Sequence, residues 1–286
     1  MTNQPLVSIL VANYNNGHYF KECYESLIKQ TYHNWECVIV DDKSTDNSIE
    51  LINQLIRNDN RFKLFLNDDN LGVGSTKKKC IELASGEICG FIDPDDAIVE
   101  KALSIMINHI IKKPNQSIYY SNFIYCDENL NPERVRNTFQ IESENIDFYN
   151  IGGEISHLAF FYRKHYFQTE GLNQKMRRAI DQDLYLKLYD LSSGKVLHIN
   201  EDLYYYRIHQ NGISTNNNTK KAVFWHWVAI IKSAERRDVN IENLFIDNFI
   251  DKSEYDKVKR KLDLLKKSKL LRLLHKLGLF KAYKYL

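Results

Sequence analysis

Three carboxylates follow a short apolar run near the end of the first third of the chain. The run is Ile88–Ile92, and Asp93, Asp95 and Asp96 follow it, with Pro94 between the first two. A run of this length predicts a buried strand, which ends at Pro94 because proline has no N–H to donate. Carboxylates at a strand end repel one another unless a cation lies between them, and Mg²⁺ binds one or two carboxylates together with substrate phosphate oxygens. The pattern predicts either a divalent metal site or a solvated acidic turn.

A second acidic pair, Asp41-Asp42, follows another apolar run. Apolar runs at 6–12, 35–40, 62–66 and 88–92 alternate with helical periodicity at 20–28, 49–56 and 77–84. This alternation predicts βαβ units and a parallel sheet. Open sheets of this kind bind ligands at the carboxyl ends of their strands, so we expect both acidic groups at the same edge.

The rest of the chain predicts further helices and strands. Helical spacing is found at 102–110 and 179–189, and strand-like runs at 117–125, 157–162, 196–199 and 203–206, whereas 133–155 is polar and expected to be irregular. The expected fold class is α/β, with a mostly parallel sheet flanked by helices and a helical C-terminal extension. We expect a catalytic domain over 1–215, with halves 1–100 and 101–215, and an extension over 216–286.

Composition and simple motifs exclude several classes of protein. The chain is 43% hydrophobic and 27% charged with a net charge of +2, as in ordinary globular proteins. Its five cysteines form no CxxC pair and are expected to be buried free thiols of a cytosolic protein. Residues 1–5 lack the pattern of a signal peptide, and no apolar run approaches the ~20 residues of a membrane span. Gly72-Val73-Gly74 extends neither to the GxGxxG motif nor to a P-loop, so the sequence matches neither a dinucleotide-binding Rossmann protein nor a Walker NTPase.

Several segments, in their order and spacing, resemble the GT-A glycosyltransferases of family 2. They are Val7–Asn15, Val40–Asp46, Asn70–Gly74 and Ile92–Asp96 in the first half, then Gly171-Leu172, Asp181–Leu188 and Tyr206–His209. The resemblance covers about residues 5–215. It implies an inverting transfer of a sugar from a nucleotide-diphosphate donor, a UDP-sugar first of all, to a hydroxyl of a glycan acceptor. Bacterial capsule, O-antigen or exopolysaccharide synthesis is the implied setting, and the absence of QxxRW favours single addition.

The resemblance also implies a divalent metal, Mn²⁺ or Mg²⁺. Its ligands would be Asp95 first, with Asp93, Asp96 and His209 as the other candidates. Such a metal would stabilise the charge that builds on the departing diphosphate. The alternative role of Asp93 is to form a hydrogen bond with the ribose. The alternative interpretation of His209 is a histidine in a surface loop without a role in the site.

By the same resemblance Asp181 is the general base that accepts the proton of the acceptor hydroxyl. The family's ED motif falls on Ile180-Asp181, so Ile180 replaces the preceding acid. The alternative role of Asp181 is that of a helix N-terminal carboxylate stabilised by the helix dipole. Lys77 stands where the family usually has Arg, and lysine keeps the charge without the bidentate fork. The implied nucleotide-sugar-binding residues are Ala12, Tyr14, Asn15, Asp41, Asp42, Lys77, Asp93, Asp95, Arg207 and His209.

The C-terminal segment is strongly basic. Between Lys252 and Leu286 there are twelve Lys and Arg against three Asp and Glu, and Leu270, Leu273, Leu274 and Leu277 follow helical spacing beside them. A basic amphipathic helix indicates either contact with an anionic membrane surface or packing on protein. Membrane contact would suit a lipid-linked acceptor and a cytoplasmic protein held at the inner face of the plasma membrane. No nucleic-acid-binding motif accompanies the charge, so no nucleic acid partner is expected.

Two other functions compete with glycosyl transfer. A nucleotidyltransferase would need a glycine-rich, basic loop after the first strand, where this chain has Asn13-Tyr14-Asn15. A nucleotide-binding or membrane-associated scaffold with a degenerate site is the non-enzymatic alternative. The retained carboxylates argue against a scaffold, and Ile180 argues for one.

Overall fold

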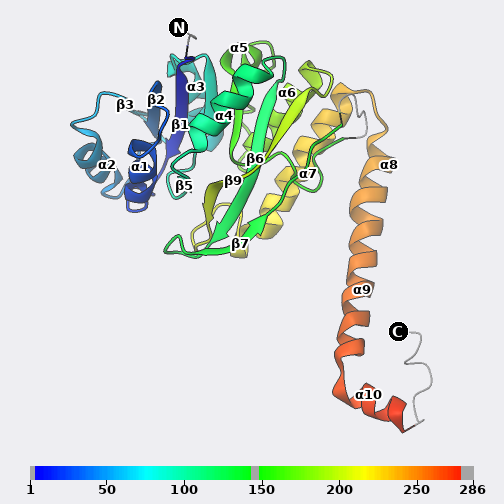
Figure 1. Ribbon diagram of the computed structural model, residues 1–286. Helices are drawn as coiled ribbons and strands as arrows, with labels where there is room; N and C mark the ends of the chain where they lie inside the picture. The colour runs from blue at the N-terminus through cyan, green and yellow to red at the C-terminus, as the bar shows by residue number, and fades with distance from the viewer. Residues whose placement is uncertain (1–3, 143–147, 278–286) are drawn as a thin grey trace. The chain divides into compact units, whose positions relative to one another are not determined.

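The computed structural model describes residues 4–142 and 148–277 (Figure 1). The chain divides into two compact units, Met1–Ser233 and Ala234–Leu286. The division lies later than residue 215, where we expected the catalytic domain to end. The reason is that Trp227, Ile230 and Ser233 are buried within the first unit, so most of the helix that follows residue 218 belongs to it.

The first half of the larger unit is the predicted set of βαβ repeats. Strands β1 (Val7–Asn13), β2 (Trp35–Asp41), β3 (Phe62–Leu66) and β4 (Ile88–Phe91) are parallel and lie in the order β3-β2-β1-β4. Helices α1 (Phe20–Ile28), α2 (Ser48–Ile56) and α3 (Val73–Leu83) connect them. Helix α3 begins four residues before the expected start at Lys77, directly after Gly72.

The second half makes the sheet mixed. Strand β8 (Ala159–Tyr162) is antiparallel to β4 and to β6 (Ile118–Cys126), and β9 (Val196–Arg207) runs parallel to β6. Strand β5 (Ala97–Ile98) pairs with β9 at the edge. Helices α4 (Ala102–Lys112), α5 (Arg163–Tyr166) and α6 (Ile180–Leu191) complete this half. The α/β class with helices flanking a sheet is therefore confirmed.

Two expectations about strands were wrong. The runs at 196–199 and 203–206 form one strand, β9, because both pair with β6, and a shift of register accommodates the exposed residues between them: Ser121 pairs with Ile199 and Asn122 with Asp202. The segment expected to be irregular contains β7 (Pro132–Arg136), which pairs with β6 through its backbone although its side chains are mostly exposed. In both places the strand is formed by backbone hydrogen bonds, which the hydropathy of the side chains does not reveal.

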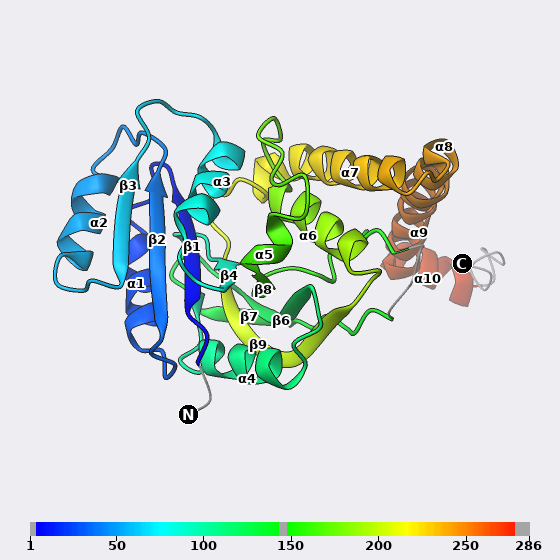
Figure 2. The same cartoon turned by 90° about the horizontal axis from the view of Figure 1, so that it is seen from above.

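Helices cover both faces of the sheet (Figure 2). Phe20 of α1, Ile52 of α2 and Met106 of α4 are buried in one cluster with Ile9 and Ile39 of the sheet. Helix α3 packs on β1 and β2 from the other side, where α5 and α6 also lie. Burial on both faces explains the continuous apolar runs of the parallel strands. All five cysteines are buried and free, as predicted.

The C-terminal part is helical, as predicted. Helix α7 (Thr219–Arg236) follows the short 3₁₀ turn η1 (Asn216–Asn218) and crosses the boundary between the units. Beyond it lie α8 (Ile241–Phe245), the π-helical turn η2 (Ile246–Asp251), α9 (Lys252–Lys267) and α10 (Lys269–Lys276). Among the helices of the described residues, none has both the length and the apolar character needed to span a bilayer. Lys281 and Lys284 of the basic segment lie outside the described residues.

Candidate active site

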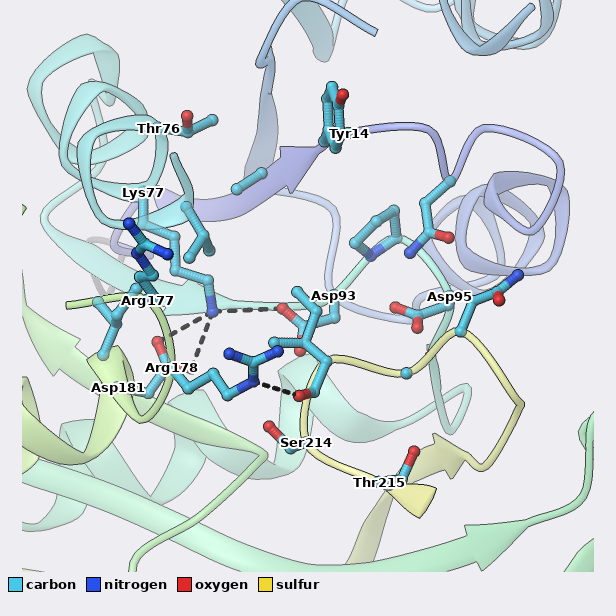
Figure 3. A pocket seen from close by; sticks show the side chains of 18 of the residues that line it. Tyr14, Thr76, Lys77, Asp93, Asp95, Arg177, Arg178, Asp181, Ser214 and Thr215 are labelled. Carbon is cyan, nitrogen blue, oxygen red and sulfur yellow. Dashed lines mark hydrogen bonds and ion pairs between the residues drawn. The ribbon is translucent and has the colours of Figure 1, made fainter. Parts of the chain in front are cut away.

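A cavity of about 1080 Å³ lies at the carboxyl ends of the parallel strands (Figure 3). Its wall contains every residue that the resemblance placed in the site except Asp41. These residues are Ala12, Tyr14, Asn15, Asp42, Lys77, Asp93, Asp95, Asp96, Asp181, Arg207 and His209. They come from β1, α3, α6, β9 and the loops after β1, β2, β4 and β9, so the fold brings the separate motifs together.

Asp41 holds two loops together beneath this wall. Its fully buried carboxylate accepts hydrogen bonds from Asn13 Nδ2 at 2.6 Å and from the backbone N–H and hydroxyl of Ser44 at 2.7 and 2.6 Å. The Ser44 hydroxyl in turn accepts the N–H of Asn15 at 2.9 Å. These bonds join the end of β1 to the loop after β2 and so fix Tyr14, whose side chain is half exposed in the cavity.

Asp42 organises the glycine-containing loop before α3. One carboxylate oxygen accepts the N–H of Leu71 at 2.9 Å, and the other accepts the N–H of Gly72 at 2.8 Å. Gly72 has φ of +83°, a backbone conformation that glycine adopts without steric cost, and α3 begins at the next residue. The loop thereby sets the start of α3, which carries Lys77 into the cavity.

Lys77 joins two carboxylates at the centre of the site. Its ammonium nitrogen lies 2.8 and 3.0 Å from the two oxygens of Asp181 and 3.2 Å from Asp93 (Figure 3). Burial alone would lower the pKa of Lys77, but the charges of Asp181 and Asp93 outweigh it and raise that pKa. Burial likewise opposes the lowering of the Asp93 pKa, which Lys77 and then His157 bring about. The three groups form a partly desolvated ion cluster.

His157 is a site residue that the sequence did not reveal. Its Nε2 atom lies 3.9 Å from Asp93 and 3.8 Å from Asp181, and its ring stacks on Tyr204 with a centroid distance of 5.1 Å. In the sequence it only begins an apolar run, so nothing distinguished it. Asp181 is the second residue of α6, next to the positive end of the helix dipole.

Asp95 and His209 meet on the other side of the cavity. His209 Nε2 lies 2.7 Å from Asp95 Oδ2. His209 is only 4% exposed and packs against the ring of Tyr19, so the surface-loop interpretation of this histidine was wrong. The pair presents one oxygen and one nitrogen ligand at the strand-end turn.

Asp96 and Arg207 stabilise that turn from beneath. Both oxygens of Asp96 accept hydrogen bonds, one from the Tyr204 hydroxyl at 2.6 Å and one from the Arg207 N–H at 2.8 Å. Burial, together with the charges of Asp95 and Asp93, raises the pKa of Asp96 well above its usual range. The guanidinium of Arg207 donates to the carbonyl of Asp95 at 2.6 Å and to that of Glu128 at 2.7 Å.

The donor atoms fit a divalent cation only if a substrate completes its coordination. Within the described residues no group of three or more acidic, histidine or cysteine side chains is arranged to hold a metal. Asp95 and His209 would supply two ligands, whereas both Asp96 oxygens already accept hydrogen bonds. Mg²⁺ characteristically uses one or two carboxylates and takes the remaining ligands from phosphate and water. The Asp95–His209 pair therefore suits a metal that binds with a diphosphate.

The cavity wall also contains residues to which the sequence analysis assigned no role. They are Arg177, Arg178, Ser214, Thr215, Lys220, Lys221, Phe224 and Trp225. Arg178 donates to the carbonyl of Ile213 at 2.7 Å and to the Asn218 side chain at 3.1 Å, and so attaches the polar loop after β9 to the start of α6. In the sequence these residues include two basic pairs, Arg177-Arg178 and Lys220-Lys221, but such pairs are common on protein surfaces and did not indicate a site.

Two curated bacterial synthases are similar to this chain over most of its length. The chain is 28% identical over 255 residues to chondroitin synthase and 27% identical over 280 residues to hyaluronan synthase, both of Pasteurella multocida. These matches cover 88% and 93% of the chain but only 26% and 28% of the relatives, so the chain spans about a quarter of their length.

Solved structures with low sequence identity share the fold. TarS of S. aureus in complex with UDP matches with a TM-score of 0.65 and 20% identity, over 83% of this chain and 68% of that one. The mannosyltransferase PcManGT of Pyrobaculum calidifontis, in complex with GDP-Man and Mn²⁺, matches with a TM-score of 0.64 and 17% identity. This match covers 99% of this chain and 83% of PcManGT.

The family itself follows from a sequence profile. The profile described as glycosyl transferase family 2 matches residues 8–168, which is more than half of the chain. The matched segment contains β1 to β4, the Asp42 loop, Lys77 and the carboxylates after β4. The chain therefore belongs to glycosyl transferase family 2.

Proposed function

We propose that this chain transfers a sugar, with inversion, from a UDP-sugar to a hydroxyl of a glycan acceptor during the synthesis of a bacterial surface polysaccharide. The observation that carries the proposal is the convergence of the family motifs on one cavity, with Asp95 and Asp181 both on its wall. Supporting it, TarS was solved with UDP and with UDP-GlcNAc, and the relatives include chondroitin and hyaluronan synthases.

In this mechanism Asp181 is the general base. A carboxylate oxygen of Asp181 takes the proton of the acceptor hydroxyl as that oxygen forms a bond to the anomeric carbon. The bond from this carbon to the diphosphate breaks on the opposite face, and its electron pair leaves with the nucleoside diphosphate. Lys77 orients the Asp181 carboxylate through two short contacts and links it to Asp93 on the donor side.

The donor would lie along the ends of β1, β2 and β4. Tyr14 offers an exposed ring to the base, and Ala12, Asn15 and Asp42 line the same part of the cavity. Asp95 and His209 would hold Mn²⁺ or Mg²⁺, which when bound would stabilise the negative charge on the leaving diphosphate. Asp93, which faces Lys77, is placed to accept a hydrogen bond from the ribose or the donor sugar.

We further propose that the C-terminal unit touches an anionic membrane surface and so brings the enzyme to a lipid-linked acceptor. Helix α10 and the residue that caps it expose three leucines, each by more than half: Leu270, Leu273 and Leu277. Three cations of the same segment accompany them: Lys269, Arg272 and Lys276. An exposed apolar face flanked by cations is the pattern of helices that lie in the headgroup region. The enzyme would then work in the cytoplasm at the inner face of the membrane.

The direct test is calorimetric titration of UDP, GDP and CMP into the purified protein, with and without Mn²⁺. We expect UDP to bind only when metal is present, and Asp95→Ala to abolish that binding. Failure of all three nucleotides to bind in the presence of Mn²⁺ would refute the transferase mechanism. Metal-dependent UDP binding without turnover, across a panel of UDP-sugars and glycan acceptors, would favour the scaffold instead.

A further inference from the structure

Four cations outside the predicted site line the cavity. Arg177 and Arg178 precede α6, and Lys220 and Lys221 lie in the first turn of α7. Figure 3 shows both arginines on the side of Asp181, across the cavity from Asp95. We call these four residues the cation wall.

The carboxylates of the cavity are bonded to groups outside the cation wall. Asp93 and Asp181 share Lys77, and Asp95 contacts His209. Asp42 and Asp96 accept hydrogen bonds from N–H and hydroxyl groups. In the parts of the chain that the structure describes, no carboxylate lies within ion-pair distance of any cation of the wall. Four like charges on one wall repel each other unless an anion joins them.

The wall lies where the acceptor must approach. Arg178 and Arg177 are three and four residues before Asp181, the proposed base, whereas Asp95, which contacts His209, lies on the opposite side. The cavity of about 1080 Å³ exceeds the range of about 300–1,000 Å³ that holds one small ligand, so a second substrate has room beside the donor.

Aromatic side chains adjoin the cations on the same helix. Phe224 and Trp225 follow Lys220 and Lys221 by four residues each, which places each pair on one side of α7. The Phe224 side chain is 61% exposed and also lines the cavity. Cations beside an exposed aromatic surface suit a ligand whose anionic group adjoins a sugar ring or an apolar chain.

We propose that the cation wall binds a diphosphate in the acceptor, so that the substrate class is a glycan joined through diphosphate to a lipid. This inference rests on the proposed function. A diphosphate offers several charged oxygens to the two guanidinium forks and two ammonium groups, whereas a single carboxylate would leave most of the wall unpaired. The positive end of the α7 dipole adds to the attraction.

The experiment uses the whole protein, saturated with UDP and Mn²⁺ so that the donor site is filled. Farnesyl diphosphate is the probe, farnesol is the uncharged comparison, and binding is measured by calorimetry. The variant is Lys220→Gln with Lys221→Gln. The matched control is Lys112→Gln with Lys113→Gln, an exposed lysine pair at the end of α4 that does not line the cavity.

We expect the Kd for farnesyl diphosphate to rise at least about tenfold in the Lys220/Lys221 variant, because two charge-assisted contacts are lost. The control should bind as the wild type does, and UDP affinity should be the same in all three proteins. An unchanged Kd for farnesyl diphosphate would overturn the inference. So would an equal loss of UDP affinity, which would assign the wall to the donor diphosphate.

A second comparison separates phosphate from carboxylate and this inference from the proposed function. Methyl glucuronide that displaces the probe as well as inorganic pyrophosphate does would overturn the choice of diphosphate. If UDP fails to bind the wild type, the proposed function is refuted, and so is the acceptor role of the cation wall. If UDP binds and farnesyl diphosphate does not, only the inference falls.

Discussion

The ammonium nitrogen of Lys77 lies 2.8 Å from a carboxylate oxygen of Asp181, although the two residues are 104 positions apart in the chain. Lys77 comes from α3 in the first half of the larger unit, and Asp181 lies in the first turn of α6 in the second half. The same ammonium contacts Asp93 after β4 at 3.2 Å. This ion cluster joins the two halves of the catalytic unit at the point where the proposed base must be held.

The cluster predicts a large loss of stability when Lys77 is neutralised. Lys77→Met leaves Asp93 and Asp181 without their shared cation, and breaking a buried ion pair in this way costs about 3–5 kcal/mol. Lys77→Arg keeps the charge and should retain most of the stability. Urea unfolding at pH 7 measures both. The control is Lys78→Met, a change of a more exposed neighbour that should alter stability by no more than about 0.5 kcal/mol. Equal stability of Lys77→Met and Lys78→Met would refute the role of the cluster.

Removing the proposed base should slow the chemical step without affecting donor binding. Asp181→Asn keeps the shape of the side chain but cannot accept the proton, so kcat should fall by about 10²–10⁴ while the Kd for UDP stays the same. Asp202→Asn, on an exposed part of β9, should leave kcat unchanged. Steady-state kinetics and UDP titration provide the two readouts. A fall in UDP affinity alone would make Asp181 a donor-binding residue.

Two of the aspartates after β4, Asp95 and Asp96, should respond differently to substitution. Asp95→Asn should raise the Mn²⁺ concentration needed for UDP binding, because Asp95 supplies the proposed oxygen ligand, and chelation by EDTA should abolish the binding in the wild type. Asp96→Asn should leave the metal requirement unchanged but lower the stability by about 1–3 kcal/mol, because its carboxylate accepts bonds from Tyr204 and Arg207 inside the protein. The reverse pattern would make Asp96 the metal ligand.

Glu36 should make the stability depend on acid pH. Burial opposes the lowering of the Glu36 pKa, but Lys63, Ser8 and the Ser85 N–H together lower it. A folded-state pKa below the unfolded value of about 4.3 gives stability that is present above that pH and is lost as the pH falls through the folded pKa. Glu36→Gln should therefore destabilise the protein at pH 7, and its difference from the wild type should shrink below about pH 4. Urea unfolding at several pH values measures this difference in stability, with the exposed Glu50→Gln variant as the control. A difference between Glu36→Gln and the wild type that does not change with pH would contradict the prediction.

The basic C-terminal helices should bind anionic vesicles. Phosphatidylglycerol vesicles should sediment the protein at low salt, and phosphatidylcholine vesicles should not, because the attraction is electrostatic and is screened by salt. Leu273→Glu, on the exposed apolar face of α10, should reduce this binding. Ile111→Glu, an equally drastic change at an exposed site on α4, should not. If both variants bound alike, α10 would not be the membrane contact.

The sequence by itself determined the α/β class, the parallel strands β1 to β4 and the positions of the acidic strand ends. These features depend on local hydropathy and on proline and glycine, which act over a few residues. The order of the motifs was also enough to indicate the family, because spacing along the chain is visible without a structure.

Only the tertiary structure decided which atoms face the cavity. Asp41 and Asp42 are adjacent in sequence, yet Asp42 lines the cavity and Asp41 ties loops together beneath it. Asp96 faces inward because Tyr204, 108 residues away, donates to it. His157, the cation wall and the joining of the β9 segments likewise depend on contacts between distant parts of the chain. Such contacts leave no local pattern, because hydropathy and spacing describe a residue's neighbours in sequence and not its neighbours in space.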